Sequence, residues 1–284
     1  MTDIPPTTSA SQLTAYAMCP RLYAMRYVYH VEPEFRSLNL ALGSAVHGAI
    51  GWFFEEKLAG RIPLLDEADR IVAADLLAET SGVLVRWKDE TPQTLEQKAQ
   101  SLVRTYLGKY AEQDVVAVEQ RFEVDIVHPE NGDSLPRPLV GYFDLLARTK
   151  NQDIIEIKTT SKAWHPKSLE RHLQVGSYVT AANAMHGGPA RVSVHAILKQ
   201  KTPRVEEYHV ERGEYDMLNL WFFQAAKEIE GAIAAGHFPP SPGNTCYECE
   251  YAKSCLEYHE NVVPLRQQHR APQRDDRQPL RIAV

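Results

Sequence analysis

The spacing of apolar residues changes once along this chain of 284 residues, near position 110. Before that point, apolar side chains recur at helical spacing, with few helix breakers, in four stretches: 9–29, 42–58, 66–87 and 95–110. After it, runs rich in β-branched residues predict strands at 115–127, 139–149, 153–160, 191–198 and 204–210. Further helices are expected at 168–185 and 214–235. The chain should therefore form an α/β fold in which helices flank a mixed sheet.

Helix breakers and composition divide the chain into four parts. A helical part covers 1–110, and a strand-rich core covers 111–238. Three prolines end the last long helix, and a cysteine-rich module follows at 239–260. The remainder, 261–284, is rich in Arg, Gln and Pro, which predicts a mobile tail.

Charge and composition limit the classes of function. The net charge is −6 and 44% of the residues are apolar, so a sizeable core is expected and a general basic coat is excluded. Segment 148–204, however, has ten Lys or Arg and three acids, a net charge of +7. This segment is either a local track for a polyanion or an ordinary solvated face. No membrane helix and no secretory signal is found, so we expect a cytoplasmic protein.

Acidic and basic residues interrupt two apolar strands in the second half of the chain. Glu156 and Lys158 lie two residues apart in DIIEIKTT, so they share one face of their strand. Asp144 interrupts the preceding strand. If a three-residue loop, 150–152, joins the strands, residue 144 faces residue 158 and all three side chains share a face. A two-residue loop would place Asp144 on the other face.

This group of residues has a catalytic and a structural interpretation. Two carboxylates, together with the backbone carbonyl of Ile157, can bind a hard divalent cation such as Mg²⁺. A bound cation can activate a water and neutralise a phosphodiester, and Lys158 could orient that water or stabilise developing negative charge. Taken alone, the same residues could equally form a salt bridge between neighbouring strands.

Four motifs, in order, make the sequence resemble the PD-(D/E)XK nuclease superfamily, and specifically its RecB-like branch. That branch includes the nuclease domains of RecB and AddB and CRISPR-associated RecB-like exonucleases. The motifs are GSAVHGAI with His47, GYFDLLART with Gly141 and Asp144, DIIEIKTT with Glu156, Lys158 and Thr159, and HLQVGSYVTA with Gln174 and Tyr178. The sequence departs slightly from this pattern, because relatives often carry Asp-Tyr-Lys where this chain has Glu-Ile-Lys.

The resemblance implies a restriction-endonuclease-like fold and a role for each motif. It implies that His47, Asp144, Glu156 and the Ile157 carbonyl bind Mg²⁺ or Mn²⁺, and an imidazole ligand suits Mn²⁺ better. It implies that Lys158 activates water, while Gln174 and Tyr178 hold DNA and the lysine. The implied activity is exonuclease cleavage of single-stranded DNA ends in DNA repair, recombination or CRISPR adaptation. A helicase or an integrase is a candidate partner.

The cysteines form a second candidate site. Cys246, Cys249 and Cys255 have the spacing C-x2-C-x5-C, and Cys19 lies far upstream. Four thiolates can bind zinc or a [4Fe–4S] cluster, and their spacing alone does not distinguish the two. The arrangement resembles the iron–sulfur staple of AddB-type and CRISPR-associated relatives, which implies a [4Fe–4S] cluster rather than zinc. Such a cluster would join the N-terminal helices to the C-terminal module.

Two alternatives remain open from the sequence. The first is a non-catalytic DNA-end-binding or adaptor subunit built on the same fold. The second is a zinc-stapled structural protein in which Asp144, Lys158 and Glu156 form a buried salt bridge.

Overall fold

The structure of the protein is a computed structural model that describes residues 4–148, 153–186, 191–210 and 212–259. The turn expected at 150–152 and the tail expected at 261–284 lie outside these residues. The helical part consists of α1 (Ala10–Met18), α2 (Pro20–Tyr23), the π-helix η1 (Ala24–Val28), α3 (Leu38–Leu58), α4 (Leu65–Thr80) and α5 (Pro92–Tyr110).

Local sequence signals explain where several of these helices begin and end. The Ser9 hydroxyl caps α1 by accepting a hydrogen bond from the Gln12 backbone N–H at 3.2 Å. Helix α2 begins at Pro20. Proline is well tolerated there, because the backbone N–H that it lacks would have no hydrogen-bond partner in the first turn of a helix. The helix expected at 66–87 is shorter, because Gly82 adopts a left-handed φ of 72° just beyond Thr80.

The second half of the chain forms a five-stranded mixed sheet. Its strands are β1 (Val115–Val124), β2 (Leu139–Ala147), β3 (Asp153–Thr160), β4 (Val192–Leu198) and β5 (Arg204–Val210), in the spatial order β1-β2-β3-β4-β5. Only the pair β3–β4 is parallel; the other neighbours are antiparallel. Strand β3 is therefore central, and residues on it are well placed to be shielded from water.

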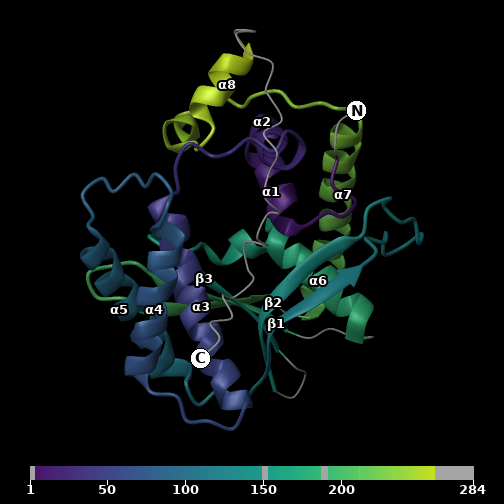
Figure 1. Ribbon diagram of the computed structural model, residues 1–284. Coiled ribbons are helices and arrows are strands. Elements are labelled where there is room, and N and C mark those ends of the chain that lie inside the picture. Colours follow the sequence, from purple (N-terminus) through teal and green to yellow (C-terminus); the bar gives the residue numbers. More distant parts are fainter. Residues whose placement is uncertain (1–3, 149–152, 187–190, 211, 260–284) are drawn as a thin grey trace.

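Helices cover both faces of this sheet. The remaining elements are the 3₁₀ segments η2 (Pro166–Arg171), η3 (Arg212–Glu214) and η4 (Asn244–Glu248), and the helices α6 (Leu173–His186), α7 (Tyr215–Ala234) and α8 (Ala252–His259). Figure 1 shows α3, α4 and α5 on one side of the strands and α6 and α7 on the other. Ile155 and Ile157 pack in the cluster formed with α3–α5, whereas Ile154 packs in the cluster formed with α6 and α7. The alternation predicted for β3 is confirmed.

The register between β2 and β3 differs from the one we predicted. Ala147 pairs with Asp153 and Leu145 pairs with Ile155, whereas the predicted register paired residue 149 with residue 153. The connection between the paired ends runs from 148 to 152, two residues longer than the expected loop. Loop length sets hairpin register, and this connection could not be read from local sequence.

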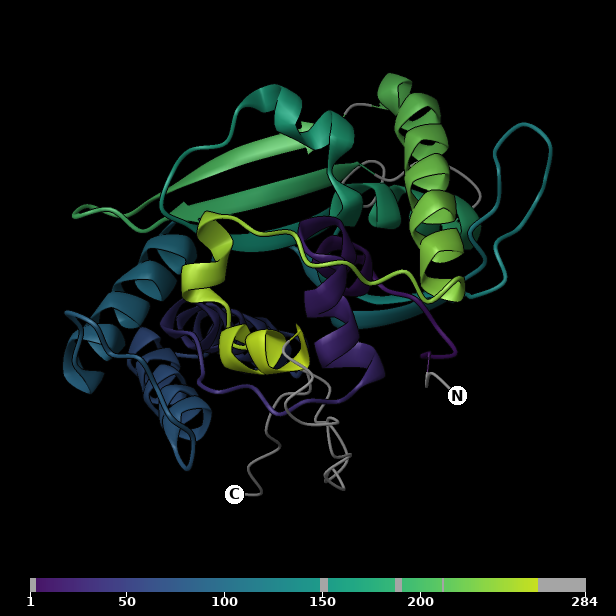
Figure 2. The same cartoon turned by 90° about the horizontal axis from the view of Figure 1, so that it is seen from above.

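The N- and C-terminal parts of the described chain lie side by side. Figure 2 shows the yellow α8 next to the purple N-terminal helices. The backbone N–H of Glu34 donates to the carbonyl of Glu250 at 2.8 Å, and Arg26 pairs with the Glu250 carboxylate at 2.5 Å. The Glu34 carboxylate also accepts from the N–H of Lys253 at 2.7 Å, in the first turn of α8. These contacts join the cysteine-rich module to the N-terminal helices independently of any metal.

Packing explains why position 141 of the GYFDLLART motif is a glycine. It stands opposite Phe122 in the β1–β2 register, and a Cβ added at Gly141 would lie 2.4 Å from Cζ of that ring. The ring therefore occupies the space that any side chain at position 141 would need.

Gly141→Ala should destabilise the fold by about 1–3 kcal/mol, the usual cost of overpacking. Urea unfolding would measure this loss, and Phe122→Leu is the informative second change because it shortens the obstructing side chain. In a double-mutant cycle, part of the Gly141→Ala loss should disappear in the Phe122→Leu background. Strictly additive losses would contradict the packing explanation.

His195 on β4 is a buried titratable group. Its Nδ1 lies 3.0 Å from the hydroxyl of Tyr106, and its ring stacks on Tyr110 with centroids 4.4 Å apart. Burial lowers the pKa of His195 to about 4, although the nearby Glu207 carboxylate acts in the opposite direction. The imidazole is therefore neutral in the folded protein at pH values where the unfolded chain already binds a proton.

We expect this histidine to make folding stability fall as the pH falls from about 6.5 toward 4. The depressed pKa predicts a loss of about 2 kcal/mol between pH 7 and pH 5, because protonation is favoured only in the unfolded chain. Denaturant unfolding of wild type and His195→Phe at both pH values measures the difference, with the exposed His165→Gln as control. An unchanged pH dependence in His195→Phe would contradict the assignment.

No helix in the described part of the chain combines the length and the apolar character needed to cross a membrane.

Candidate active site

Asp144 connects helix α3 with the central strand. Its side chain is 3% exposed, and Oδ2 accepts a hydrogen bond from the backbone N–H of Ile157 at 2.8 Å. Nδ1 of His47, on α3, lies 3.4 Å from the same Oδ2. The structure thus brings together the histidine and the aspartate of two motifs that are almost one hundred residues apart in the sequence.

Strands β2 and β3 separate at Asp144. Their pairing extends from Ala147–Asp153 to Leu145–Ile155, and beyond it the Asp144 carboxylate binds the Ile157 N–H. In a β-strand, the N–H and C=O of one residue point to the same side. The Ile157 carbonyl is therefore directed into the opening beside Asp144, as a carbonyl ligand would require.

Side-chain alternation in β2 also breaks at Asp144. Phe143 contacts the Tyr178 ring on the α6 side, with centroids 5.2 Å apart, whereas Leu145 packs in the α3 cluster. Glu119, opposite Asp144 in the β1–β2 register, has a φ of 47°, which is uncommon for a residue other than glycine. Asp144 therefore reaches His47 on the α3 side and does not share a regular face with Glu156, in contrast to our prediction.

The Glu156 carboxylate is held from the α6 side. It is 1% exposed, its Oε1 accepts from the Gln174 side-chain amide at 2.7 Å, and Oε2 accepts from the Tyr178 hydroxyl. Lys158 pairs with Oε1 and is 28% exposed. The Tyr178 hydroxyl also lies 2.8 Å from the carbonyl of Tyr142, a contact that no sequence pattern indicated. The residues of the D/E-x-K and Q-x-x-x-Y motifs thus form one connected group.

Two neighbours of the site were given no role by the sequence analysis. His172 lies close enough to Lys158 for the lysine charge to lower its pKa, in addition to the larger lowering caused by burial. Asp75 on α4 packs against α3, where a Cβ added at Gly48 would lie 2.3 Å from Oδ2. Burial raises the pKa of Asp75 to about 6. His172 is the first residue of the HLQVGSYVTA motif, whereas Asp75 belongs to none of the four motifs, so only the fold reveals it.

The donor set fits a divalent cation after a limited rearrangement. Two carboxylates, both almost fully buried, come from the neighbouring strands β2 and β3, and an imidazole lies beside one of them. As the side chains stand, no group of three or more His, Cys, Asp or Glu among the described residues is arranged to hold a metal ion. Glu156 is engaged with Gln174, Tyr178 and Lys158, so it would exchange one of these contacts for a cation.

The four cysteines influence one another electrostatically, although no three cysteines of the described residues are arranged to hold a metal ion as they stand. All four thiols are free, and Cys19 accepts a hydrogen bond from the backbone N–H of Ser241 at 3.4 Å. Burial raises the pKa of Cys249, and the charges of Cys19 and Cys255 raise it further. Burial likewise raises the pKa of Cys255, whereas the Arg21 charge lowers it. The upstream cysteine therefore interacts with the C-terminal cysteines, as a shared site requires.

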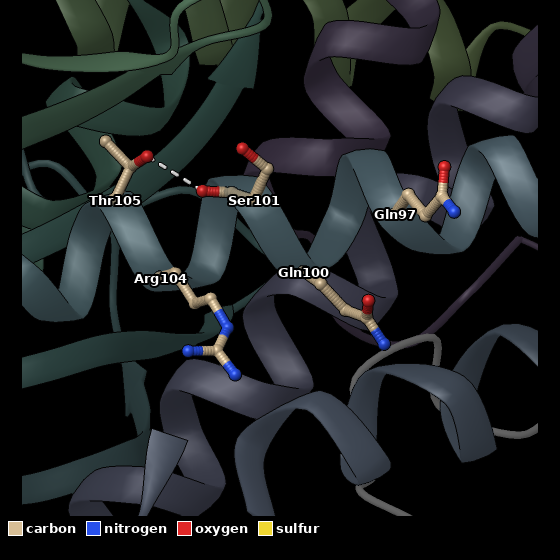
Figure 3. Close-up of a pocket in the computed structure, with 5 residues that line it drawn as sticks. All are labelled: Gln97, Gln100, Ser101, Arg104 and Thr105. Atoms are coloured by element: carbon tan, nitrogen blue, oxygen red, sulfur yellow. Dashed lines mark hydrogen bonds between the residues drawn. The ribbon is translucent and has the colours of Figure 1, made fainter. Parts of the chain in front are cut away.

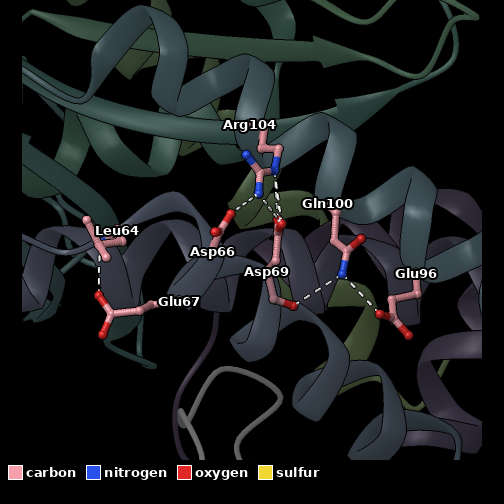
Figure 4. Close-up of polar contacts among 7 residues, drawn as sticks. All are labelled: Leu64, Asp66, Glu67, Asp69, Glu96, Gln100 and Arg104. Atoms are coloured by element: carbon pink, nitrogen blue, oxygen red, sulfur yellow. Dashed lines mark hydrogen bonds and ion pairs between the residues drawn. The ribbon is translucent and has the colours of Figure 1, made fainter.

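Other polar features lie on the helices away from these residues. A hollow of about 470 Å³ on α5 is lined by Gln97, Gln100, Ser101, Arg104 and Thr105 (Figure 3). Figure 4 shows Arg104 reaching across to Asp66 and Asp69 of α4, with the closest approach to Asp69 at 2.5 Å. Because these ion pairs are exposed at the surface, they serve mainly to align the two helices. None of the candidate catalytic residues lines this hollow.

Comparison with known proteins agrees with this geometry. A model of the PD-(D/E)XK nuclease superfamily matches residues 7–256, which include all four motifs and all four cysteines. The chain belongs to the PD-(D/E)XK nuclease superfamily. No curated protein matches the sequence.

Two solved structures are similar to this member of the superfamily. The crystal structure of a protein named "Putative exonuclease", from Eubacterium rectale, has a TM-score of 0.53 and 13% identity. That match covers 91% of this chain and 90% of the other. A crystal structure of the protein SSO0001 has a TM-score of 0.30 and 13% identity, covering 85% of this chain and 92% of the other. At such low identity, the first likeness shows the shared fold alone.

Proposed function

We propose that this PD-(D/E)XK protein is a divalent-metal-dependent deoxyribonuclease. The observation that supports it most directly is the hydrogen bond from Ile157 N–H to Asp144, which ties the buried carboxylate of β2 to the strand that carries Glu156 and Lys158. Burying two carboxylates is costly unless they are compensated. The Ile157 N–H and His47 compensate Asp144, and Lys158 with the α6 side chains compensates Glu156; a bound cation would take over part of this compensation.

The proposed roles follow from the contacts of each side chain. His47, Asp144, Glu156 and the Ile157 carbonyl would hold Mg²⁺ or Mn²⁺. When bound, the cation supplies charge neutralisation at the phosphodiester and makes a nearby water more acidic. Lys158, which is partly exposed, can donate to that water or to a phosphate oxygen. Gln174 and Tyr178 orient Glu156 from the opposite side.

The substrate we infer is single-stranded DNA with a free end, in line with the RecB-like branch. The basic segment supports a polyanionic substrate, because Lys162, Lys167 and Arg171 are exposed between β3 and α6. Lys158 lies on the adjoining end of β3, so a backbone bound along these cations would lead toward the site. A helicase or integrase partner and a role in repair, recombination or CRISPR adaptation remain proposals from the same resemblance.

We also infer that the four cysteines bind a [4Fe–4S] cluster with a structural role. Four free thiols from the two ends of the described chain match the donor set of such a cluster, and their mutual electrostatic interaction supports a common site. A colourless protein that carries stoichiometric zinc would contradict the cluster.

The nuclease proposal is tested by incubating the purified protein with linear single-stranded DNA, labelled at either end, with Mn²⁺ or Mg²⁺. We expect cleavage from an end, support by Mn²⁺ at least equal to that by Mg²⁺, and loss of cleavage with EDTA. Circular single-stranded DNA is the matched control, and it should resist an exonuclease. Binding without cleavage under all metal conditions would instead favour a non-catalytic end-binding subunit.

A further inference from the structure

Arg21, a cation whose charge acts on Cys255, is buried with one hydrogen-bond donor unused. Arg21 follows Cys19 by two residues in α2, and it is only 8% exposed. Its Nε donates to the carbonyl of Phe238 at 2.9 Å, but Nη1, also buried, has no hydrogen-bond partner among the described residues. Burying a guanidinium with an unpaired N–H costs free energy of folding, so we expect an acceptor close to this donor.

The position of Arg21 identifies that acceptor. Its guanidinium carbon lies 3.9 Å from the centroid of the Tyr258 ring, on α8. Tyr258 follows Cys255 by three residues, so both side chains lie on one face of that helix. Arg21 is therefore fixed between the two segments that carry the cysteines. No carboxylate within the described ranges forms an ion pair with it, so the anionic group available is the set of thiolates.

We propose that Arg21 is a positioning residue of the cysteine site, which donates a charge-assisted hydrogen bond through Nη1 to a metal-bound sulfur. A set of four metal-bound thiolates carries excess negative charge in a partly buried place, and a fixed cation beside it lowers the cost of that charge. This inference rests on the proposed metal site, and it adds a residue that is itself no ligand.

Three variants distinguish a hydrogen bond to the metal site from a purely structural contact between the N-terminal helices and the cysteine-rich module. Arg21→Met removes the charge and the donor, whereas Arg21→Lys keeps the charge. Arg26→Met is the matched control, because Arg26 also joins an N-terminal helix to the cysteine-rich module, through Glu250, without a buried unsatisfied donor. The readouts are iron and sulfide per chain, the rate of iron release to a chelator, and the midpoint potential of the bound group.

We expect Arg21→Met to release iron about tenfold faster than wild type and to shift the midpoint potential to a more negative value, since a neighbouring cation favours the reduced form. Arg21→Lys should retain most of the wild-type potential, and Arg26→Met should release iron within about twofold of the wild-type rate. Equal effects of Arg21→Met and Arg26→Met would overturn the proposal, because they would reduce Arg21 to a docking contact.

Two further outcomes are distinguishable. If Arg21→Met does not fold, Tyr258→Leu removes the ring that holds the guanidinium; faster iron release would support the proposal, and wild-type release would overturn it. If wild type contains zinc, the cluster assignment fails, yet zinc release from the same variants tests Arg21 in the same way. Wild type without any metal would overturn both the metal site and the role of Arg21.

Discussion

Lys158→Ala should lower DNA cleavage by at least about 10²–10³-fold while leaving the fold almost unchanged, because its ammonium is expected to act on the water or the phosphate. The structure explains why stability should survive. Glu156 keeps its hydrogen bonds from Gln174 and Tyr178 when the lysine is removed, and Lys158 is already 28% exposed. Single-turnover cleavage of labelled single-stranded DNA and thermal melting measure the two effects.

Lys98→Ala is the control for this experiment. It removes the same charge from an exposed lysine that also pairs with a carboxylate, that of Glu90 at 3.1 Å, but lies on α5 outside the basic segment, so it should change cleavage only slightly. The salt-bridge alternative predicts the reverse for Lys158→Ala: stability lost by about 3–5 kcal/mol, as for a broken buried pair, with no cleavage to lose. A melting shift of that size without a nuclease defect would refute the catalytic assignment.

Asp144→Asn should abolish metal-supported cleavage, with an expected loss of at least about 10³-fold, because the contribution of a bound cation is several kcal/mol. The substitution preserves shape, and an asparagine oxygen can still accept the Ile157 N–H that now lies 2.8 Å from Oδ2. The affinity for Mn²⁺, measured by titration calorimetry, should fall together with activity, while the far-UV spectrum and melting curve stay close to wild type.

Asp153→Asn provides the matched control, since Asp153 is also a buried acid but lies at the start of β3, beside Arg191. It should leave both Mn²⁺ affinity and cleavage near wild-type values. If Asp144→Asn cleaves normally, or if both variants lose activity equally, Asp144 has no specific part in binding the cation.

The sequence predicted which residues lie close together better than it predicted how they meet. Motif spacing identified Asp144, Glu156 and Lys158, and the i, i+4 spacing correctly placed Gln174 and Tyr178 on one side of α6. It did not predict that Glu156 would be held by that helix. Contacts between a strand and a helix depend on packing across the sheet, which local spacing does not encode.

Local sequence determined the elements of this protein: the helices before residue 110, the strands after it, and the alternation of Ile154, Glu156 and Lys158 against Ile155 and Ile157. These follow from hydrophobic period and from short-range capping. Tertiary structure alone decided that β2 and β3 part at Asp144, that α6 holds Glu156, and that Arg21 stacks on Tyr258. Such contacts join residues far apart in the chain, and their geometry is set by the packing of whole elements.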